Sequence, residues 1–329
     1  MGGWSSEREI SVQSGLSVYR NLDNNKYNKC LFNILKDKRI QITPENIEIT
    51  ENSLTEIPAI NLIPALLLLQ NWGIDAAFLV THGTGGEDGV LQGFLEMFDI
   101  AYTHSDIRGS AVAMDKEISK YIYAANQIPT PACFILQKNS DVAAEFKNSG
   151  FQFPIISKAI SQGSSVGIFQ CHDLKELEEK VQETLNYSSR VMIEEYVKQR
   201  EFTCAVIETT KGLQALAVTE IITQTEFFDY NAKYYDKQTK EIVPAEIPEA
   251  LALEIQELAK RAHQALKCSG ASRSDVLQDA TGKLYVIETN TIPGMTEQSL
   301  LPKAAGISEF GFSGVLDLLI DNALTRNKN

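Results

Sequence analysis

The sequence contains few cysteines and comparatively few basic residues. Five cysteines are scattered through 329 residues, without a Cys-x-x-Cys pair. This pattern favours neither a disulfide framework nor a zinc site, and we expect a reducing, cytoplasmic environment. Thirty basic residues against 43 acidic residues give a formal net charge of -13. That balance argues against a protein that coats nucleic acid, because such a surface needs many cations to neutralise phosphates.

Long apolar stretches and a Walker A sequence are also absent. The longest apolar run, residues 60–69, is interrupted by Asn61 and Pro64 and falls short of the ~20 residues that a membrane-spanning helix requires. The N-terminus lacks the basic segment, apolar run and cleavage site of a secretory signal. We therefore expect no membrane partner. Without G-x-x-x-x-G-K-[ST], any phosphate site must use an architecture other than the P-loop.

Short apolar strands alternate with amphipathic helices along the chain. Residues 76–80 form an apolar run that ends in a glycine-rich segment, and apolar residues then recur at helical spacing. This order predicts a doubly wound parallel α/β sheet. A helix ending before Pro129 is expected to carry Lys116 on its polar face. From residue 153 the pattern changes to β-strands, and we place domain boundaries near residues 108 and 196, giving regions 1–108, 109–195 and 196–329.

Two strands near the C-terminus are predicted to form a hairpin. They span Ser272–Gln278 and Leu284–Asn290 and are joined by a tight-turn sequence at residues 279–282. Because side chains two residues apart on a strand share a face, Glu288 and Asn290 point the same way.

The pairing of this hairpin decides what else lies on that face. If Gln278 pairs with Lys283, Arg273 lies opposite Glu288 and Asp275 sits diagonally across from it. Two carboxylates and an amide oxygen then converge, and such oxygen ligands suit Mg²⁺. The alternative is a cross-strand ion pair on a solvated face.

A second candidate is the glycine- and serine-rich segment 162–167, which we expect at the tip of a hairpin. Its backbone N–H groups can approach phosphate oxygens without obstruction by Cβ atoms, and Lys158 could add a positive charge. The alternative is a plain turn.

His82 has two interpretations, whereas the sequence around Glu7 favours a solvated side chain. His82 follows an apolar strand, where open α/β sheets place ligands, so it is either a catalytic imidazole or a structural side chain that bonds the glycine loop. Glu7 stands in a glycine- and serine-rich opening loop, where an exposed carboxylate is usually only solvated.

Taken in order, these segments resemble the motifs of the D-alanine–D-alanine ligase family of the ATP-grasp superfamily, over nearly the whole chain. The matching motifs are Gly2-Gly3-x-Ser5-x-Glu7-Arg8-Glu9-Ile10-Ser11, the His82–Gly89 loop with Gln92-Gly93, Met114-Asp115-Lys116, Gly163-Ser164-Ser165-Val166-Gly167, Asp229-Tyr230-x-Ala232-Lys233-Tyr234 and Glu288-x-Asn290-Thr291-x-Pro293-Gly294-Met295-Thr296. The resemblance leaves out one family element, a β-strand before the Gly-Gly turn, because only Met1 precedes Gly2.

The resemblance implies a fold and a reaction. The fold is an N-terminal doubly wound parallel sheet (the pre-ATP-grasp domain), which binds substrate, followed by a two-lobed ATP-grasp fold with antiparallel sheets that enclose ATP. The carboxylate of one D-alanine attacks the γ-phosphate of ATP, and the amino group of a second D-alanine attacks the resulting acyl phosphate. The products are D-alanyl-D-alanine for peptidoglycan precursor synthesis, ADP and phosphate. Two Mg²⁺ ions, replaceable by Mn²⁺, and a homodimer are also implied.

The resemblance further implies roles for individual residues. The nucleotide contacts are Lys116, Lys158, Ser165, Glu194, Glu195, Tyr196, Val197 and Glu201. The magnesium ligands are Asp275, Glu288 and Asn290. The residues around the first D-alanine and the reacting atoms are Glu7, His82, Ser164, Tyr234, Arg273 and Gly294. The second substrate is held by Lys233, Ser299 and Leu300.

Two alternatives to this function stay open at the level of sequence. One is a ligase whose second substrate is D-lactate or D-serine, since a few pocket residues decide that choice. The other is an ATP-grasp protein that binds nucleotide but has lost catalysis.

Overall fold

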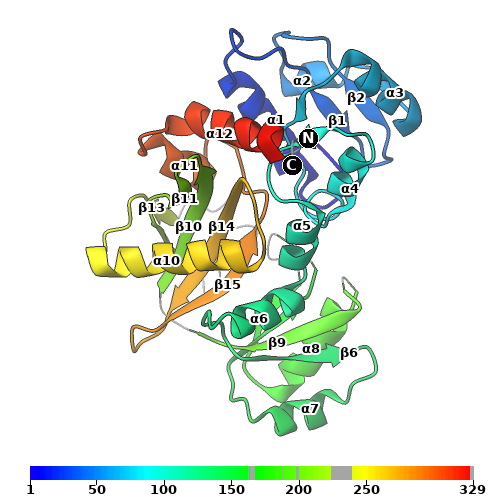
Figure 1. Cartoon of the computed structure of the whole chain (residues 1–329). Helices are drawn as coiled ribbons and strands as arrows, with labels where there is room; N and C mark the ends of the chain where they lie inside the picture. The colour runs from blue at the N-terminus through cyan, green and yellow to red at the C-terminus, as the bar shows by residue number, and fades with distance from the viewer. Residues whose placement is uncertain (162, 164–166, 187, 198–199, 224–238, 327–329) are drawn as a thin grey trace.

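The structure is a computed structural model that describes residues 1–161, 163, 167–186, 188–197, 200–223 and 239–326 (Figure 1). Its described strands form four sheets, which follow one another along the chain. The two larger sheets are antiparallel throughout, as predicted for the ATP-grasp lobes. No helix in the described ranges combines the length and apolar character needed to cross a membrane.

The N-terminal region combines parallel and antiparallel pairing. Its strands are β1 (Phe32–Ile34), β2 (Ile40–Ile42), β3 (Ala59–Ile60), β4 (Ala76–Ala77) and β5 (Ala101–Tyr102). Its helices are α1 (Arg8–Asn21), α2 (Glu51–Leu54), α3 (Leu62–Trp72), α4 (Val90–Glu96) and α5 (Ile107–Met114). The predicted parallel pairing is present between β4 and β5, whereas β1, β2 and β3 pair antiparallel. Residues 1–3 lie beside β1, where Gly2 forms a parallel bridge with Ile34.

The single helix expected before Pro129 is two helices. Helix α6 (Lys116–Ala125) follows α5 directly, and Asp115, in extended backbone geometry, caps the start of α6 by accepting from the N–H groups of Glu117 and Ile118. The prediction that Lys116 lies on a polar outer face was wrong, because Lys116 is buried while Ile118 is exposed. Asp115 is therefore the residue at which α5 ends and, through its side-chain carboxylate, the N-cap of α6.

The central sheet has the strand order β6-β9-β7-β8. Its elements are β6 (Cys133–Gln137), α7 (Val142–Ser149), β7 (Ile155–Ala159), β8 (Ile168–Cys171), α8 (Leu174–Thr184) and β9 (Arg190–Glu195). Apolar side chains from α8, including Leu177 and Val181, pack against Ile155 and Ile193 of the sheet. The predicted hairpin is confirmed, since β7 and β8 pair antiparallel on either side of the glycine-rich segment.

The C-terminal sheet has the order β13-β12-β10-β14-β15, with β11 also paired to β10. Its strands are β10 (Arg200–Thr209), β11 (Gly212–Ala215), β12 (Thr219–Ile222), β13 (Lys240–Ile242), β14 (Ala271–Gln278) and β15 (Leu284–Asn290). Its helices are α10 (Glu249–Ala265), α11 (Leu300–Gly306) and α12 (Gly311–Arg326). Helix α10 covers one face, where Ile255 and Ala259 pack against Phe202 (Figure 1).

Helix α12 joins the C-terminal sheet to the N-terminal region. Leu319 shares one apolar core with residues of α1 and β10. At the end of α12, the Arg326 guanidinium donates to the backbone oxygens of Tyr102 (2.7 Å) and His104 (2.5 Å) and to Ser269 Oγ (2.7 Å). The same group lies 4.6 Å from the centroid of the Tyr102 ring. One side chain therefore ties both regions together.

We predict that Arg326→Ala lowers the free energy of unfolding by about 2 kcal/mol, because charged hydrogen bonds to three acceptors are lost. Urea unfolding measures this change. The matched control is Thr325→Ala, at the exposed neighbouring position, for which we expect a change within about 0.5 kcal/mol. Equal stability of the two variants would contradict the assigned role of Arg326.

Candidate functional site

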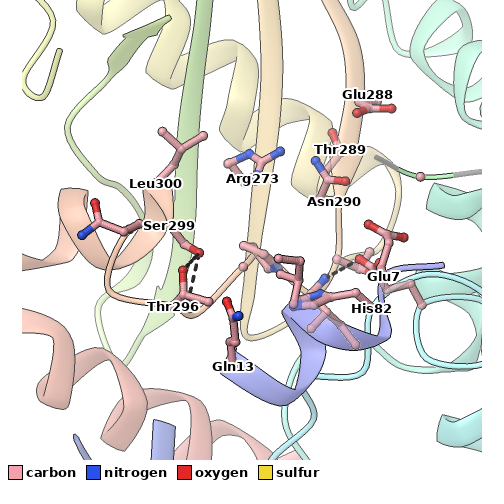
Figure 2. Close-up of a pocket in the computed structure, with 18 of the residues that line it drawn as sticks. Glu7, Gln13, His82, Arg273, Glu288, Thr289, Asn290, Thr296, Ser299 and Leu300 are labelled. Carbon is pink, nitrogen blue, oxygen red and sulfur yellow. Dashed lines mark hydrogen bonds between the residues drawn. The ribbon is translucent and has the colours of Figure 1, made fainter. Parts of the chain in front are cut away.

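A cavity of about 520 Å³ lies where α1, the glycine-rich loop after β4, strands β14 and β15, and the start of α11 meet. Its lining includes nine of the predicted site residues: Glu7, His82, Lys116, Arg273, Glu288, Asn290, Gly294, Ser299 and Leu300. Gly163 of the glycine-rich segment lines it as well. Figure 2 shows Glu7 and His82 on one side, Ser299 and Leu300 on the other, and Arg273 between them. Four predicted residues lie outside the described part of the chain: Ser164, Ser165, Lys233 and Tyr234.

The hairpin pairs its strands in a register that differs from the prediction. Asp275 lies directly opposite Glu288, and Arg273 lies opposite Asn290. The expected pairing of Arg273 with Glu288 was wrong for two reasons. Asp279 pairs with Lys283 around a three-residue turn, so that Gln278 faces Leu284, and a β-bulge follows between Asp275 and Val276. The turn and the bulge each shift the register by one residue. The two shifts together leave Asp275 and Glu288 on the same face of the hairpin.

Charges on this face are closely compensated. The Arg273 guanidinium donates to both carboxylate oxygens of Asp275, at 3.0 and 3.1 Å, and Thr203 Oγ1 donates to Asp275 at 2.6 Å. Glu288 forms an ion pair with Lys116 Nζ at 3.3 Å. Asp275 is buried, whereas Glu288 and Asn290 border the cavity. The alternative of an ion pair on a solvated face does not describe this arrangement.

The oxygen donors of this face fit Mg²⁺. Glu288 and Asn290 present a carboxylate and an amide at the cavity, with the Asp275 carboxylate opposite Glu288. The Asn290 amide nitrogen is buried and makes no hydrogen bond to the described residues. Those residues contain no cluster of three or more His, Cys, Asp and Glu that could hold a metal. A magnesium site here consequently depends on the amide oxygen of Asn290 as a third ligand.

Glu7 is buried, so the expectation of a solvated carboxylate was wrong. It lies at the N-terminal end of α1 with 8% of its surface exposed. Two glycines press against its carboxylate: a Cβ atom at Gly83 would lie 2.6 Å from Glu7 Oε2, and one at Gly163 would lie 2.7 Å away. A side chain at either position would therefore displace the Glu7 carboxylate. Gly83 also has a positive φ of 71°, which favours glycine.

His82 is both structural and accessible to the cavity. Its Nε2 lies 3.2 Å from Ser14 Oγ, which also accepts from the Met295 N–H at 3.3 Å. Burial lowers the pKa of His82 to about 4, and the nearby Arg273 charge acts in the same direction. The imidazole is therefore neutral at pH 7, and it lines the cavity beside Glu7 (Figure 2).

Glu87 is a cavity residue to which the motif analysis assigned no separate role. Its carboxylate accepts from the Gly83 N–H at 2.8 Å and from the Ile292 N–H at 3.2 Å. Burial, and then the neighbouring Glu7 carboxylate, raise the pKa of Glu87 to about 8. Glu87 thus joins the glycine loop to the segment after β15. The only sequence feature that could have pointed to Glu87 as a site residue was its position within the His82–Gly89 motif.

The predicted nucleotide residues of the central sheet form a second group around a buried carboxylate. Lys158 Nζ on β7 lies 2.5 Å from Glu194 Oε1 on β9, and Lys120 Nζ on α6 lies 2.5 Å from Glu194 Oε2. Burial lowers the pKa of Lys158. Burial raises the pKa of Glu194, but the two ammonium groups outweigh that effect and hold it below its usual value. Lys120 was missed because it belongs to no quoted motif.

The remaining nucleotide residues follow this group at the end of β9 and the start of β10. The Glu195 N–H donates to Ala132 O at 3.0 Å, and the Glu195 side chain is exposed. Tyr196, Val197 and Glu201 are half-buried. None of these residues lines the 520 Å³ cavity, so the structure separates the predicted nucleotide residues of the central sheet from the predicted substrate residues.

Gly294 and Ser299 meet at the other side of the cavity. Ser299 Oγ lies 2.8 Å from Thr296 Oγ1 and accepts from the Thr296 N–H at 3.1 Å. A Cβ atom at Gly294 would lie 2.8 Å from Ser299 Oγ. The glycine thus lets the backbone pass close to a hydroxyl at the start of α11, with Leu300 next to it.

Comparison with known proteins gives one consistent family. Residues 1–105 match the family model described as D-ala D-ala ligase N-terminus, and residues 122–321 match D-ala D-ala ligase C-terminus. A D-alanine–D-alanine ligase of Desulfotalea psychrophila is 37% identical over 99% of this chain and 94% of its own length. One of Bacillus anthracis is 37% identical over 100% of this chain and 97% of its own length.

Solved structures agree with the sequence comparisons. A D-Ala:D-Ser ligase, VanG, of Enterococcus faecalis has a TM-score of 0.86 at 30% identity, covering 98% of this chain and 97% of that chain. A D-alanine–D-alanine ligase of Bacillus anthracis complexed with ATP has a TM-score of 0.77 at 33% identity. The match covers 100% of this chain and 97% of that chain. The fold is that of an ATP-grasp ligase. The chain belongs to the D-alanine–D-alanine ligase family.

The buried His82 predicts a pH dependence of stability. Its pKa is about 4 in the folded protein and about 6.5 in an unfolded chain, so the unfolded state takes up the proton first. Stability is complete above pH 6.5 and is lost as the pH falls towards 4. Relative to His82→Gln, the wild-type free energy of unfolding should fall by up to about 3 kcal/mol over this interval. Urea unfolding at several pH values measures the difference.

The control for this measurement is His172→Gln, which removes an exposed imidazole. Its profile should parallel that of the wild type. Parallel profiles for His82→Gln and the wild type would show that His82 is not held neutral by the fold.

Proposed function

We propose that this chain joins two D-alanine molecules in an ATP-dependent reaction that yields D-alanyl-D-alanine, ADP and phosphate for peptidoglycan precursor synthesis. The observation that carries the proposal is a single cavity with complementary groups. A buried carboxylate, Glu7, faces the same space as the cation Arg273 and the oxygen donors Glu288 and Asn290. An amino acid has an ammonium group that can pair with Glu7 and a carboxylate that can pair with Arg273. Relatives named D-alanine–D-alanine ligase cover the full chain.

In the first step, one D-alanine binds with its ammonium at Glu7. Burial of this carboxylate among glycine backbone strengthens its attraction for a cation, because little water screens the charge. The carboxylate of this D-alanine attacks the γ-phosphorus of ATP, and the bond from that phosphorus to the bridging oxygen of ADP breaks. A carboxylate is a poor acylating agent, so the acyl phosphate supplies the leaving group. Ser164 and Tyr234 are assigned to this substrate by the family pattern.

Cations of the central region hold the nucleotide. Lys116 and Lys158 contact the phosphates and neutralise charge on the transferring group, and the family pattern assigns Ser165 to the nucleotide as well. Glu194, Glu195, Tyr196 and Val197 line the adenine position, and Glu201 holds the ribose. Two magnesium ions, for which manganese can substitute, are held by Asp275, Glu288 and Asn290. When bound, they neutralise negative charge on the phosphate oxygens.

In the second step, the amino nitrogen of the second D-alanine attacks the acyl carbon. A tetrahedral oxyanion forms and then expels phosphate. Arg273 and the Gly294 N–H face the oxyanion, and the neutral His82 lies beside the acyl phosphate. Lys233, Ser299 and Leu300 hold the second substrate, whose carboxylate is paired by Lys233 and Ser299.

The organisation of the protein follows the same proposal. Boundaries near residues 108 and 196 divide a substrate-binding domain from the two ATP-grasp lobes, consistent with the change of sheet at these points. The protein acts in the cytoplasm, where ATP and precursor synthesis are found. We also propose a homodimer, supported by exposed apolar side chains on α3, among them Ile63 (71% exposed), Leu67 and Trp72.

The direct test is ADP release with ATP and Mg²⁺ in the presence of D-alanine, L-alanine, D-lactate or D-serine, singly and in pairs, with products identified by mass. We expect ADP release that depends on D-alanine and yields the D-alanyl-D-alanine mass. A mixed ester or D-alanyl-D-serine as the main product would assign a different second substrate. ATP binding without turnover would identify a nucleotide-binding protein that has lost catalysis.

The metal ligands are tested by Glu288→Gln, which replaces a carboxylate oxygen with an amide nitrogen. We expect kcat to fall roughly 100-fold because a magnesium ligand and its charge are lost. The control is Glu178→Gln, an exposed position on α8, which should retain wild-type kcat. Equal activity of the two variants would remove Glu288 from the site.

The crowding at Glu7 is tested by Gly83→Ala. The added Cβ would meet Glu7 Oε2 at 2.6 Å, so the carboxylate must move, and we expect KM for the first D-alanine to rise about tenfold or more. The control is Gly150→Ala, another glycine with positive φ, where no atom lies within 4 Å of the added Cβ. If both variants keep the wild-type KM, Glu7 does not bind the substrate ammonium.

A further inference from the structure

Lys120 is a buried lysine that the reaction scheme does not use. It lies on α6 one turn after Lys116, and it is 4% exposed. Its ammonium contacts Thr130 Oγ1 at 2.8 Å, Pro131 O at 2.6 Å and Glu194 Oε2 at 2.5 Å. An ammonium has three N–H donors. Two of them are donated to Thr130 and Pro131, and the ammonium also forms the ion pair with Glu194, so Lys120 is held within the protein.

The contact with Glu194 connects Lys120 to the nucleotide site. Glu194 accepts one ammonium on each oxygen, Lys120 on Oε2 and Lys158 on Oε1. We call these three side chains the lysine–glutamate cluster. All three are at least 95% buried at the side chain, so their charges act on one another through a poorly screening medium. The cluster carries two positive charges and one negative charge, a net charge of +1.

We propose that Lys120 is a positioning residue that neutralises Glu194 so that Lys158 keeps its charge available for the nucleotide phosphates. This inference rests on the proposed function of Lys158. Without Lys120, Glu194 has one cationic partner in the cluster, and the cluster becomes neutral. The charge of the Glu194 carboxylate then offsets that of Lys158 alone, and the attraction of the cluster for phosphate falls.

A purely structural role makes a different prediction. Lys120 also fixes Thr130 and Pro131, next to Ala132, whose carbonyl accepts the Glu195 N–H. If Lys120 only held this wall of the proposed adenine position, its loss would weaken adenosine and ATP alike. If Lys120 instead acts through the charge of Lys158, its loss weakens the binding of ATP, which carries phosphates, and leaves the binding of adenosine unchanged.

The experiment compares ATP with Mg²⁺ and adenosine as probes, with dissociation constants measured by equilibrium competition. In Lys120→Met we expect the dissociation constant of ATP to rise about tenfold or more and that of adenosine to stay within about twofold. Lys120→Gln, which keeps an N–H donor, should show the same pattern and provides a second variant if the first does not fold. The control is Lys175→Met, which removes an exposed charge from the same region.

A double variant distinguishes charge from packing. Lys120→Met with Glu194→Gln restores a net charge of +1 through Lys158 alone. The ratio of ATP affinity to adenosine affinity should therefore return to within about threefold of the wild type. A ratio that stays as low as in Lys120→Met, or equal losses for ATP and adenosine in the single variants, would overturn the proposal. So would unchanged ATP affinity.

These measurements need no turnover, which keeps the two proposals separate. The ligase assay on the wild-type chain decides the proposed function. A chain that binds ATP without making dipeptide fails that assay, and the binding comparison still decides the role of Lys120.

Discussion

The antiparallel pairing of β14 with β15 fixes where the charged groups of the site lie. One face of the pair carries Arg273 and Asp275 opposite Asn290 and Glu288. The other face is closed by a buried hydrogen bond between Ser274 and Thr289, 2.8 Å long. Since the side-chain period of a strand is two, a single-residue slip would move Glu288 and Asn290 from the cavity face to the face of Ser274 and Thr289. The pairing therefore sets both the chemistry and the packing of the C-terminal sheet.

Helix α6 links this face to the central sheet through three side chains spaced at i, i+4 and i+7. Lys116 pairs with Glu288 on β15, Lys120 pairs with Glu194 on β9, and the Tyr123 hydroxyl donates to Thr289 Oγ1 at 2.8 Å. Buried charges are costly unless they are paired. One helical face therefore specifies how the two lobes meet, and it carries Lys116, one of the two cations of the proposed phosphate site.

The sequence predicted the composition of the site better than its geometry. Alternation along β15 correctly placed Glu288 and Asn290 on one face, but neither the three-residue turn nor the bulge beside Asp275 has a signature strong enough to read from one sequence. The burial of Lys116 and the break at Asp115 were missed because helical periodicity does not reveal a cap between two helices. Lys120 and Glu87 were missed because their partners, Glu194 and Ile292, are distant in the chain. Such long-range pairs depend on the fold.

The central claim is that the D-alanine carboxylate is activated by phosphoryl transfer, and isotope transfer tests it most directly. D-alanine with both carboxylate oxygens replaced by ¹⁸O is incubated with ATP, Mg²⁺ and the protein, and the released phosphate is analysed by mass. The account predicts one ¹⁸O atom in each phosphate, because the carboxylate oxygen that attacks the γ-phosphorus leaves with it. Dipeptide accompanied by unlabelled phosphate would contradict an acyl phosphate intermediate.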